Sequence, residues 1–110
     1  APTVPRLRQV DVSLGGARLQ LTLGSDASND VPLKGSLISR AHAVLEFMPE
    51  KGAVYIADVS TNGTFLNGVK LPPKGEGKVV IWHGDELLFP EPGQDVRALE
   101  FGYMVNLELL

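Results

Sequence analysis

The sequence predicts an all-β fold, an antiparallel sandwich or barrel built from many short strands. Three observations lead to this class. The dominant hydrophobic period is two, which is typical of strands with one buried face. No segment keeps apolar residues at helical spacing for three turns without a Gly or a Pro. The chain holds 12 Gly and 8 Pro, which indicates frequent turns between short elements.

The first expected elements are two strands joined by a glycine turn. Apolar and polar residues alternate over 10–14 and again over 19–23, and Gly15-Gly16 separates the two runs. This pattern is typical of a β-hairpin. Residues 1–6 are expected to form a linker into a single domain over 7–110, a length at which one hydrophobic core becomes stable.

A second hairpin is expected in the middle of the chain. Residues 43–48 form a short apolar run, and residues 53–57 form the returning strand. The four residues between them, Pro49 to Gly52, favour a turn because Pro presets φ and Gly accepts a positive φ.

Further strands are expected towards the C-terminus. The segments 78–82 and 86–89 flank His83-Gly84-Asp85, which predicts a third hairpin. Apolar residues then occupy alternate positions over 99–109, which predicts a final strand.

Composition excludes several classes of function. The formal net charge is −3, so there is no electrostatic case for binding nucleic acid or an anionic membrane. The chain has no cysteine, which excludes a disulfide framework and thiolate chemistry. No apolar run approaches the roughly 20 residues of a membrane helix. No cofactor motif is present either, and none is expected.

The most unusual segment is "DVSTNGTFLNG", from Asp58 to Gly68. Its spacing of Asp58, Ser60 and Asn62 matches the start of a calcium-binding EF-hand loop, but the twelfth position is Val69, where a bidentate carboxylate is required. Asn62 also begins a formal glycosylation sequon. Without a secretory signal, chance explains the sequon better.

The two Asn-Gly pairs of this segment have different expected roles. Asn67-Gly68 lies between two short apolar runs and predicts a tight hairpin turn, because both positions need φ > 0. Ser60 to Gly63 follows one strand and precedes another. Its polar side chains either satisfy their own backbone or present a hydroxyl and an amide to a ligand.

A second polar cluster, in "SLISRAHAVLEF", places Ser39, Arg40 and His42 just before a strand. A hydroxyl, an Arg and loop backbone amides together suit an oxyanion such as phosphate. A single His beside a strand is more often a structural hydrogen-bonding group than a catalyst. His42 is therefore expected to be structural.

An enzyme is disfavoured by the same residues. Ser39, His42 and Asp58 are the residue types of a hydrolase triad, but the Ser lacks the Gly-x-Ser-x-Gly elbow, and a His three residues after it is an unlikely base. The segment "GEGK" has Pro72 where a phosphate-binding loop needs its first Gly.

Over about residues 19–89 the sequence resembles the forkhead-associated (FHA) domain. Four motifs occur in the family's order: "LTLGSDASNDVPL", "ISRAH" with its Ser-x-x-His element, "DVSTNGTFLNG" and "WHGDELLF". The resemblance implies an antiparallel β-sandwich of about eleven strands. It also implies that the chain binds phosphothreonine in a partner protein, through loops at one end of the sandwich.

The resemblance also assigns residues to this site. Ser39 and Arg40 take positions that contact the phosphate, Thr61 a position where a hydroxyl or amide meets it, and Asn62 a position that holds the peptide backbone. Positions expected to support the site structurally are Gly24, His42 and Gly63. Phosphothreonine carries about −1.5 to −2 charge and three acceptor oxygens, which suits such a set of donors.

One position departs from the family pattern. The family typically has Gly-Arg where this chain has Gly24-Ser25, and that Arg is usually a principal phosphate contact. Loss of a charged hydrogen bond removes on the order of 1.5–3 kcal/mol. Lys34 and Arg40 are candidate replacements, and Ser25 remains a candidate contact. The departure favours an alternative, an FHA-like interaction or homodimerisation module that needs no phosphate. The family implies an intracellular location, nuclear or cytoplasmic.

Overall fold

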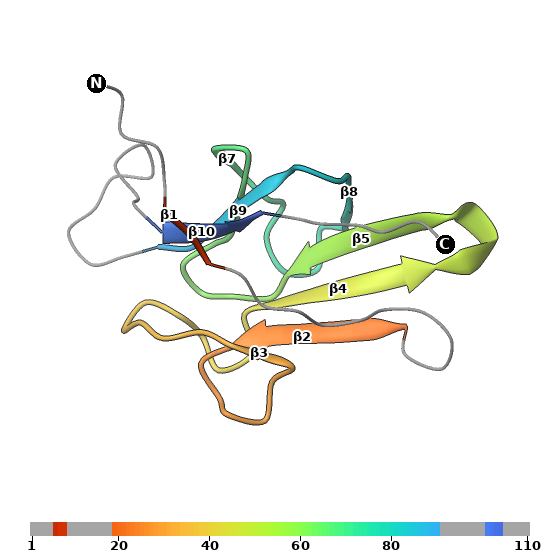
Figure 1. The fold of residues 1–110 in the computed structure, drawn as a ribbon. Helices are drawn as coiled ribbons and strands as arrows, with labels where there is room; N and C mark the ends of the chain where they lie inside the picture. The colour runs from red at the N-terminus through yellow and green to blue at the C-terminus, as the bar shows by residue number, and fades with distance from the viewer. Residues whose placement is uncertain (1–5, 9–18, 91–100, 105–110) are drawn as a thin grey trace, which may run out of the picture.

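The computed structural model describes residues 6–8, 19–90 and 101–104. These residues form ten strands and one short 3-10 helix, η1 (Figure 1). The elements are β1 (Arg6–Arg8), β2 (Gln20–Gly24), β3 (Val31–Pro32), β4 (Ala43–Met48), η1 (Pro49–Lys51), β5 (Ala53–Asp58), β6 (Phe65–Leu66), β7 (Val69–Lys70), β8 (Val79–Ile81), β9 (Glu86–Leu88) and β10 (Phe101–Met104). The predicted all-β class is confirmed.

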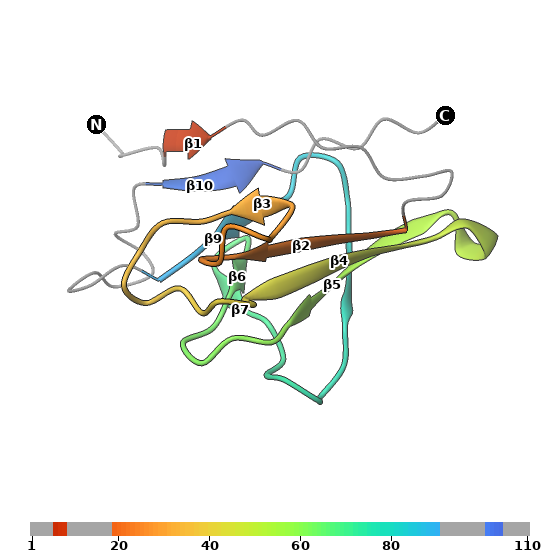
Figure 2. The same cartoon turned by 90° about the horizontal axis from the view of Figure 1, so that it is seen from below.

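The strands form two five-stranded sheets, and Figure 2 shows their strands in a view at 90° to that of Figure 1. One has the order β1-β10-β9-β6-β7 and the other the order β3-β2-β4-β5-β8. Most neighbouring strands are antiparallel, but β1 pairs with β10 and β2 pairs with β3 in parallel. The sheets are therefore mixed, whereas the sequence predicted antiparallel neighbours. A period of two shows which face of a strand is buried, but it does not show the direction of the neighbouring strand.

The hydrophobic core draws on both sheets. Ile56 of β5 and Ile81 of β8 are each 1% exposed, and Leu87 of β9 joins the same cluster from the other sheet. Burial alternates along β5, as the period-two pattern predicted. These inward side chains fix the register of the strands, because a slip of one residue would turn them to solvent.

Two of the predicted hairpins are present. β4 and β5 pair over six residues, and Gly52 at φ 59° closes the turn between them. β6 and β7 are joined by Asn67 at φ 52° and Gly68 at φ 83°. The interpretation of Asn67-Gly68 as a tight turn is confirmed.

The third predicted hairpin was wrong. β8 pairs with β5, whereas β9 pairs with β6 and β10 in the other sheet. The turn between them is closed by hydrogen bonds from Trp82 N to Asp85 Oδ2 at 2.7 Å and from Asp85 N to the Trp82 carbonyl at 3.1 Å. A turn signature predicts a reversal of the chain, but here the reversal carries the chain from one sheet to the other.

Other predictions fall partly on residues outside the described ranges. The expected strand over 10–14 lies wholly outside the described residues. So do residues 1–5 of the expected linker and the parts of the expected 99–109 strand on either side of β10. β1 begins at Arg6, the last residue of the expected linker.

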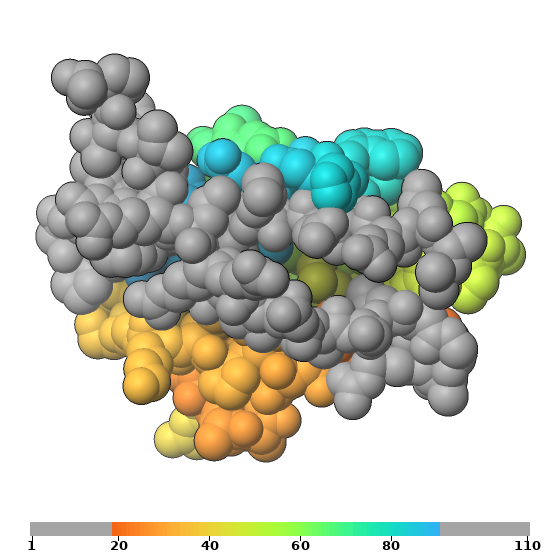
Figure 3. Space-filling model, in the orientation of Figure 1, coloured from red at the N-terminus to blue at the C-terminus, as the bar shows by residue number. Residues whose placement is uncertain are grey.

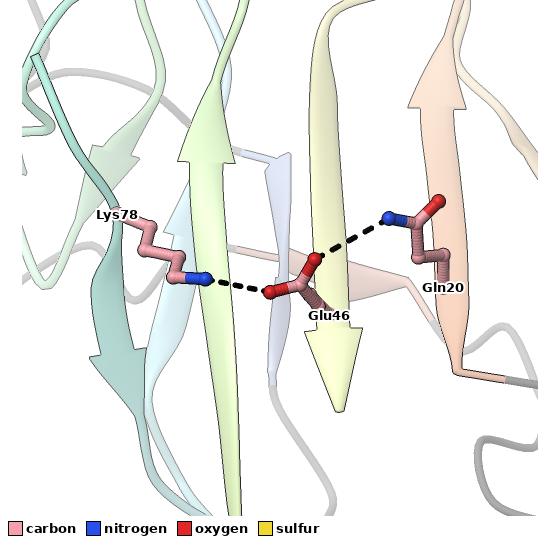
Figure 4. Close-up of polar contacts among 3 residues, drawn as sticks. All are labelled: Gln20, Glu46 and Lys78. Carbon is pink, nitrogen blue, oxygen red and sulfur yellow. Dashed lines mark hydrogen bonds and ion pairs between the residues drawn. The ribbon is translucent and has the colours of Figure 1, made fainter. Parts of the chain in front are cut away.

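A polar network crosses the outer face of the sheet that contains β4. Glu46 accepts hydrogen bonds from Gln20 Nε2 at 3.3 Å and from Lys78 Nζ at 2.6 Å (Figure 4). Lys78 reaches across β5, where its ammonium lies 5.3 Å from the centre of the Tyr55 ring. The Lys78 hydrogen bond, and then that of Gln20, lower the pKa of Glu46. The network joins β2 and the residue that precedes β8 to β4.

Candidate functional site

Strand pairing brings three loops to one end of the molecule. Ala43, the first residue of β4, pairs both with Asp58 at the end of β5 and with Leu23 near the end of β2. The segments that adjoin these residues are therefore neighbours: the β2–β3 loop (25–30), the serine loop (35–42) and the threonine loop (59–64). In Figure 3 the segment that follows β2 forms the orange and gold surface along the lower edge.

Two hydrogen bonds join the serine loop directly to the threonine loop. The Thr61 amide donates to Ser39 Oγ at 3.0 Å, and Asn62 Nδ2 donates to the Leu37 carbonyl at 3.0 Å. Because Ser39 Oγ accepts from Thr61, its own proton is left to donate to a ligand. Thr61 and Asn62 are both exposed, so this part of the threonine loop is open to solvent beside Ser39.

His42 also joins the serine loop to the threonine loop, through both nitrogens of its ring. The ring is fully buried. Its Nδ1 accepts a hydrogen bond from the Ser39 amide at 3.1 Å, so Nε2 carries the proton and donates to the Gly63 carbonyl at 2.9 Å. The Phe89 ring packs edge-on against the imidazole, with 5.3 Å between the two ring centres. Burial lowers the pKa of His42 and outweighs the Gly63 hydrogen bond and the charge of Asp58, which act in the opposite direction.

The buried carboxylate of Asp58 shapes the threonine loop. Asp58 Oδ1 accepts from the Ser60 amide at 3.1 Å, from Ser60 Oγ at 2.6 Å and from Thr64 Oγ1 at 3.0 Å. Ser60 Oγ in turn accepts from the Gly63 amide at 2.8 Å, where φ is 99°. Sequence reasoning missed this role, although the Asp-x-Ser spacing of an Asx-turn was a signal for it.

The alternatives of a hydrolase and a calcium site find no support in this geometry. Both ring nitrogens of His42 face backbone atoms, and the Asp58 carboxylate bonds Ser60 and Thr64, so Ser39, His42 and Asp58 do not form a relay. The threonine loop is flanked by strands. In the part of the chain that the structure describes, no three His, Cys, Asp or Glu residues gather closely enough to hold a metal ion.

The β2–β3 loop packs against the serine loop through backbone contacts. The Ser25 amide donates to the Ser39 carbonyl at 2.9 Å. A Cβ on Gly24 would lie 2.0 Å from the Arg40 carbonyl oxygen, so only glycine fits there. Asn29 Nδ2 donates to the same oxygen at 2.7 Å. Sequence reasoning placed Gly24 and Ser25 near the site but missed Asn29.

The candidate cations differ in how the structure places them. Arg40 is exposed on the serine loop, and among the described residues its guanidinium forms no ion pair. Its charge contributes, after hydrogen bonds from Ser28, to lowering the pKa of Asp26. Lys34 is also exposed, but no hydrogen bond or ion pair of the described residues joins it to the serine or threonine loop. The structure thus brings Ser25, Ser39, Arg40, Thr61 and Asn62 together without a comparable contact for Lys34.

A shallow hollow lies elsewhere on the surface. It has a volume of about 860 Å³ and is lined by residues of β2, β4 and η1, among them Gln20, Glu46 and Pro49. None of the candidate site residues lines it.

The described part of the chain also contains no helix with the length and hydropathy needed to span a bilayer.

Comparison with known proteins supports the resemblance. A family model for the FHA domain matches residues 21–90. The N-terminal FHA domain of S. cerevisiae Rad53p, solved with a phosphothreonine peptide, is 29% identical with a TM-score of 0.62, over 71% of this chain and 60% of that chain. The MEK1 FHA domain, solved with a HOP1 phosphothreonine peptide, is 27% identical with a TM-score of 0.54. The match covers 63% of this chain and 71% of that chain.

Full-length yeast Pml1p is 26% identical with a TM-score of 0.58, and the match covers 64% of this chain and 54% of that chain. No curated protein sequence matches the chain. The family model alone spans more than half of the residues, and its range includes all three loops of the candidate site. The chain therefore belongs to the FHA domain family.

Proposed function

We propose that this chain is a phosphothreonine-peptide-binding module of a larger protein. The observation that carries the proposal is the hydrogen bond from the Thr61 amide to Ser39 Oγ, which joins two loops so that their polar groups share one exposed surface. The two FHA domains solved with phosphothreonine peptides support it.

Each of four residues has a proposed role. The Ser39 hydroxyl and the Arg40 guanidinium bind the phosphate, and the Thr61 hydroxyl donates to the same group. The Asn62 side chain holds the peptide backbone, with its amide fixed by the Leu37 carbonyl. Ser25 and Lys34 are secondary contacts, while Gly24, His42 and Gly63 keep the loops in place.

Two broader features belong to the same proposal. The two sheets form the layers of a sandwich of about eleven strands, since residues of both contribute to one core. The module acts inside the cell, in the nucleus or cytoplasm, on a threonine-phosphorylated protein and not on nucleic acid or a membrane.

A second candidate function follows from Ser25. Because this residue replaces the usual arginine with an uncharged side chain, the domain could instead bind a partner, or a second copy of itself, without phosphate. In that case the serine and threonine loops would keep their structure and the phosphate would contribute nothing to affinity.

The deciding experiment is titration against an oriented phosphothreonine peptide library, with the unphosphorylated library as control. Binding that requires the phosphate and shifts the NMR amide signals of Ser39, Arg40, Thr61 and Asn62 is the expected result. Arg40→Gln should weaken this binding. Lys51→Gln removes the same charge from η1, at the far end of the β4–β5 hairpin, and should not. Equal binding to both libraries would favour the second function.

A further inference from the structure

Lys70 lies against the threonine loop from the β6–β7 hairpin. It pairs with Phe65 across the hairpin, and the adjacent Leu71 amide donates to the Thr64 carbonyl at 2.9 Å. A Cβ on Gly63 would lie 2.7 Å from Lys70 Cε and 3.5 Å from Nζ. The Lys70 side chain therefore occupies the space that opens because residue 63 has no side chain.

The ammonium group of Lys70 is available to a ligand. The residue is exposed, and within the described part of the chain it forms no ion pair or hydrogen bond through its side chain. Lys78 provides a contrast, because it is held by Glu46 at 2.6 Å and lies over Tyr55. A lysine that packs its alkyl chain on a glycine and leaves its charge in solvent is well suited to meet an anionic partner.

The position of Lys70 distinguishes it from the proposed phosphate contacts. Arg40 and Ser39 lie on the serine loop, whereas Lys70 reaches Gly63 on the threonine loop. Gly63 directly follows Asn62, the residue proposed to hold the peptide backbone. The Lys70 side chain therefore lies against the residue next to the one that we propose holds the peptide.

We propose that Lys70 is a specificity-determining residue that selects an anionic group flanking the phosphothreonine. The group is either the carboxylate of an Asp or Glu or a second phosphate. This inference rests on the proposed function and deepens it. An exposed ion pair of this kind changes affinity by about 1.5- to fivefold, and the effect should shrink as salt rises.

The test compares the whole chain with Lys70→Gln, Lys70→Arg and Lys51→Gln on an oriented library with phosphothreonine fixed. We expect wild type to select Asp, Glu or a second phosphorylated residue at one flanking position. Lys70→Gln should lose the selection, Lys70→Arg should keep it, and the matched Lys51→Gln control should not change it. Calorimetry with peptides that carry Glu, Gln or phosphoserine at that position then separates the two anionic sources and gives the coupling to Lys70.

The outcomes separate this inference from the function on which it rests. Phosphate-dependent binding without any anionic selection, or with a selection that Lys70→Gln retains, would overturn the role of Lys70 and leave the proposed function intact. No phosphate-dependent binding by wild type would overturn both. If Lys70→Gln lowers the melting temperature, the comparison of Glu and Gln peptides on the wild-type chain still decides whether the preference exists.

Discussion

The side-chain amide of Asn67 donates a hydrogen bond of 3.1 Å to the carboxylate of Asp85, 18 residues further along the chain. The Asn67 carbonyl oxygen also accepts from the Glu86 amide at 2.9 Å. The same Asp85 carboxylate closes its own turn by accepting from the Trp82 amide. The Asn67 side chain therefore links the β6–β7 hairpin to the turn between β8 and β9, where the chain passes from one sheet to the other.

Asn67→Ala should lower the free energy of unfolding by about 1–3 kcal/mol, because it loses these hydrogen bonds and places a Cβ residue at φ 52°. Asn67→Gly keeps the positive φ and should lose only the hydrogen-bond part. Chemical denaturation of both variants measures the difference. An Asn67→Ala domain as stable as wild type would contradict the structural role.

Asn62→Ala should show the opposite behaviour. The side chain is exposed and bonds only the Leu37 carbonyl among the described residues, so the melting temperature should move little. Affinity for a phosphothreonine peptide should fall by roughly tenfold, the effect of about one net hydrogen bond and its alignment. Calorimetry on both asparagine variants checks this, and an equal loss of affinity in the two would refute the division of roles.

The buried neutral state of His42 makes stability depend on pH. Its pKa is lowered in the folded state, so the unfolded chain binds the proton more readily below about pH 6.5. The contribution of neutral His42 to the free energy of unfolding should therefore be fully present above that pH. It should decline as the pH falls towards the lower pKa of the folded state. Protonation also removes the Nδ1 acceptor that bonds the Ser39 amide. Thermal melts between neutral pH and about pH 5 measure the slope.

Two variants control this measurement. His42→Ala should be less stable at every pH, should bind peptide more weakly because the serine loop loses its anchor, and should lose much of the slope. His83→Gln changes the exposed histidine, and this variant should keep the wild-type slope of stability against pH. A slope that survives in His42→Ala would assign the pH dependence to other groups.

Gly24→Ala should destabilise the fold by about 1–3 kcal/mol or more, because the new Cβ would meet the Arg40 carbonyl oxygen at 2.0 Å. The backbone of the serine loop would have to move, so peptide affinity should fall as well. Ser25→Ala, one residue further on and exposed, is the control and should retain stability. Denaturation midpoints of the two variants decide the matter.

Ser25→Arg should tighten phosphothreonine binding by on the order of 1–2 kcal/mol, reduced by the neighbouring Asp26 and by salt. Arg40→Ala should then cost less affinity in the Ser25→Arg background than in the natural chain, where we propose that Arg40 is the main charged partner of the phosphate. A double-mutant cycle by calorimetry gives this coupling. If wild type does not bind and only Ser25→Arg does, the natural domain has lost phosphothreonine recognition.

Local features of the fold could be predicted because their causes are local. Alternating burial along β5 and the positive φ of Asn67 and Gly68 follow from side-chain period and turn chemistry. The pairing of β8 with β5 and of β9 with β6 could not be predicted this way. A three-residue turn fits a hairpin and a crossing equally well, and the choice depends on which sheet can bury Leu87 and Leu88.

The candidate site shows the same limit. The residue types and spacing around Ser39 and Asn62 predicted two polar loops that suit a phosphate. Patterns along the chain do not contain the contacts that bring these loops together, such as Thr61 to Ser39 or Asn29 to the Arg40 carbonyl, because each joins distant residues. The Lys70 side chain over Gly63 is likewise visible only when the hairpin and the loop are seen in space.

The parallel pairing of β1 with β10 has a consequence for how the protein is made. Arg6 pairs with Phe101, so the partner of the first strand leaves the ribosome only after all of the other described strands. Until then β9 and β1 each lack a neighbour that they have in the finished sheet. Pairing over such a sequence distance is slow, and an open strand edge can associate with other chains. The sheet that contains β9 can therefore close only when synthesis has passed Met104, and the nascent chain is exposed to misassembly until that point.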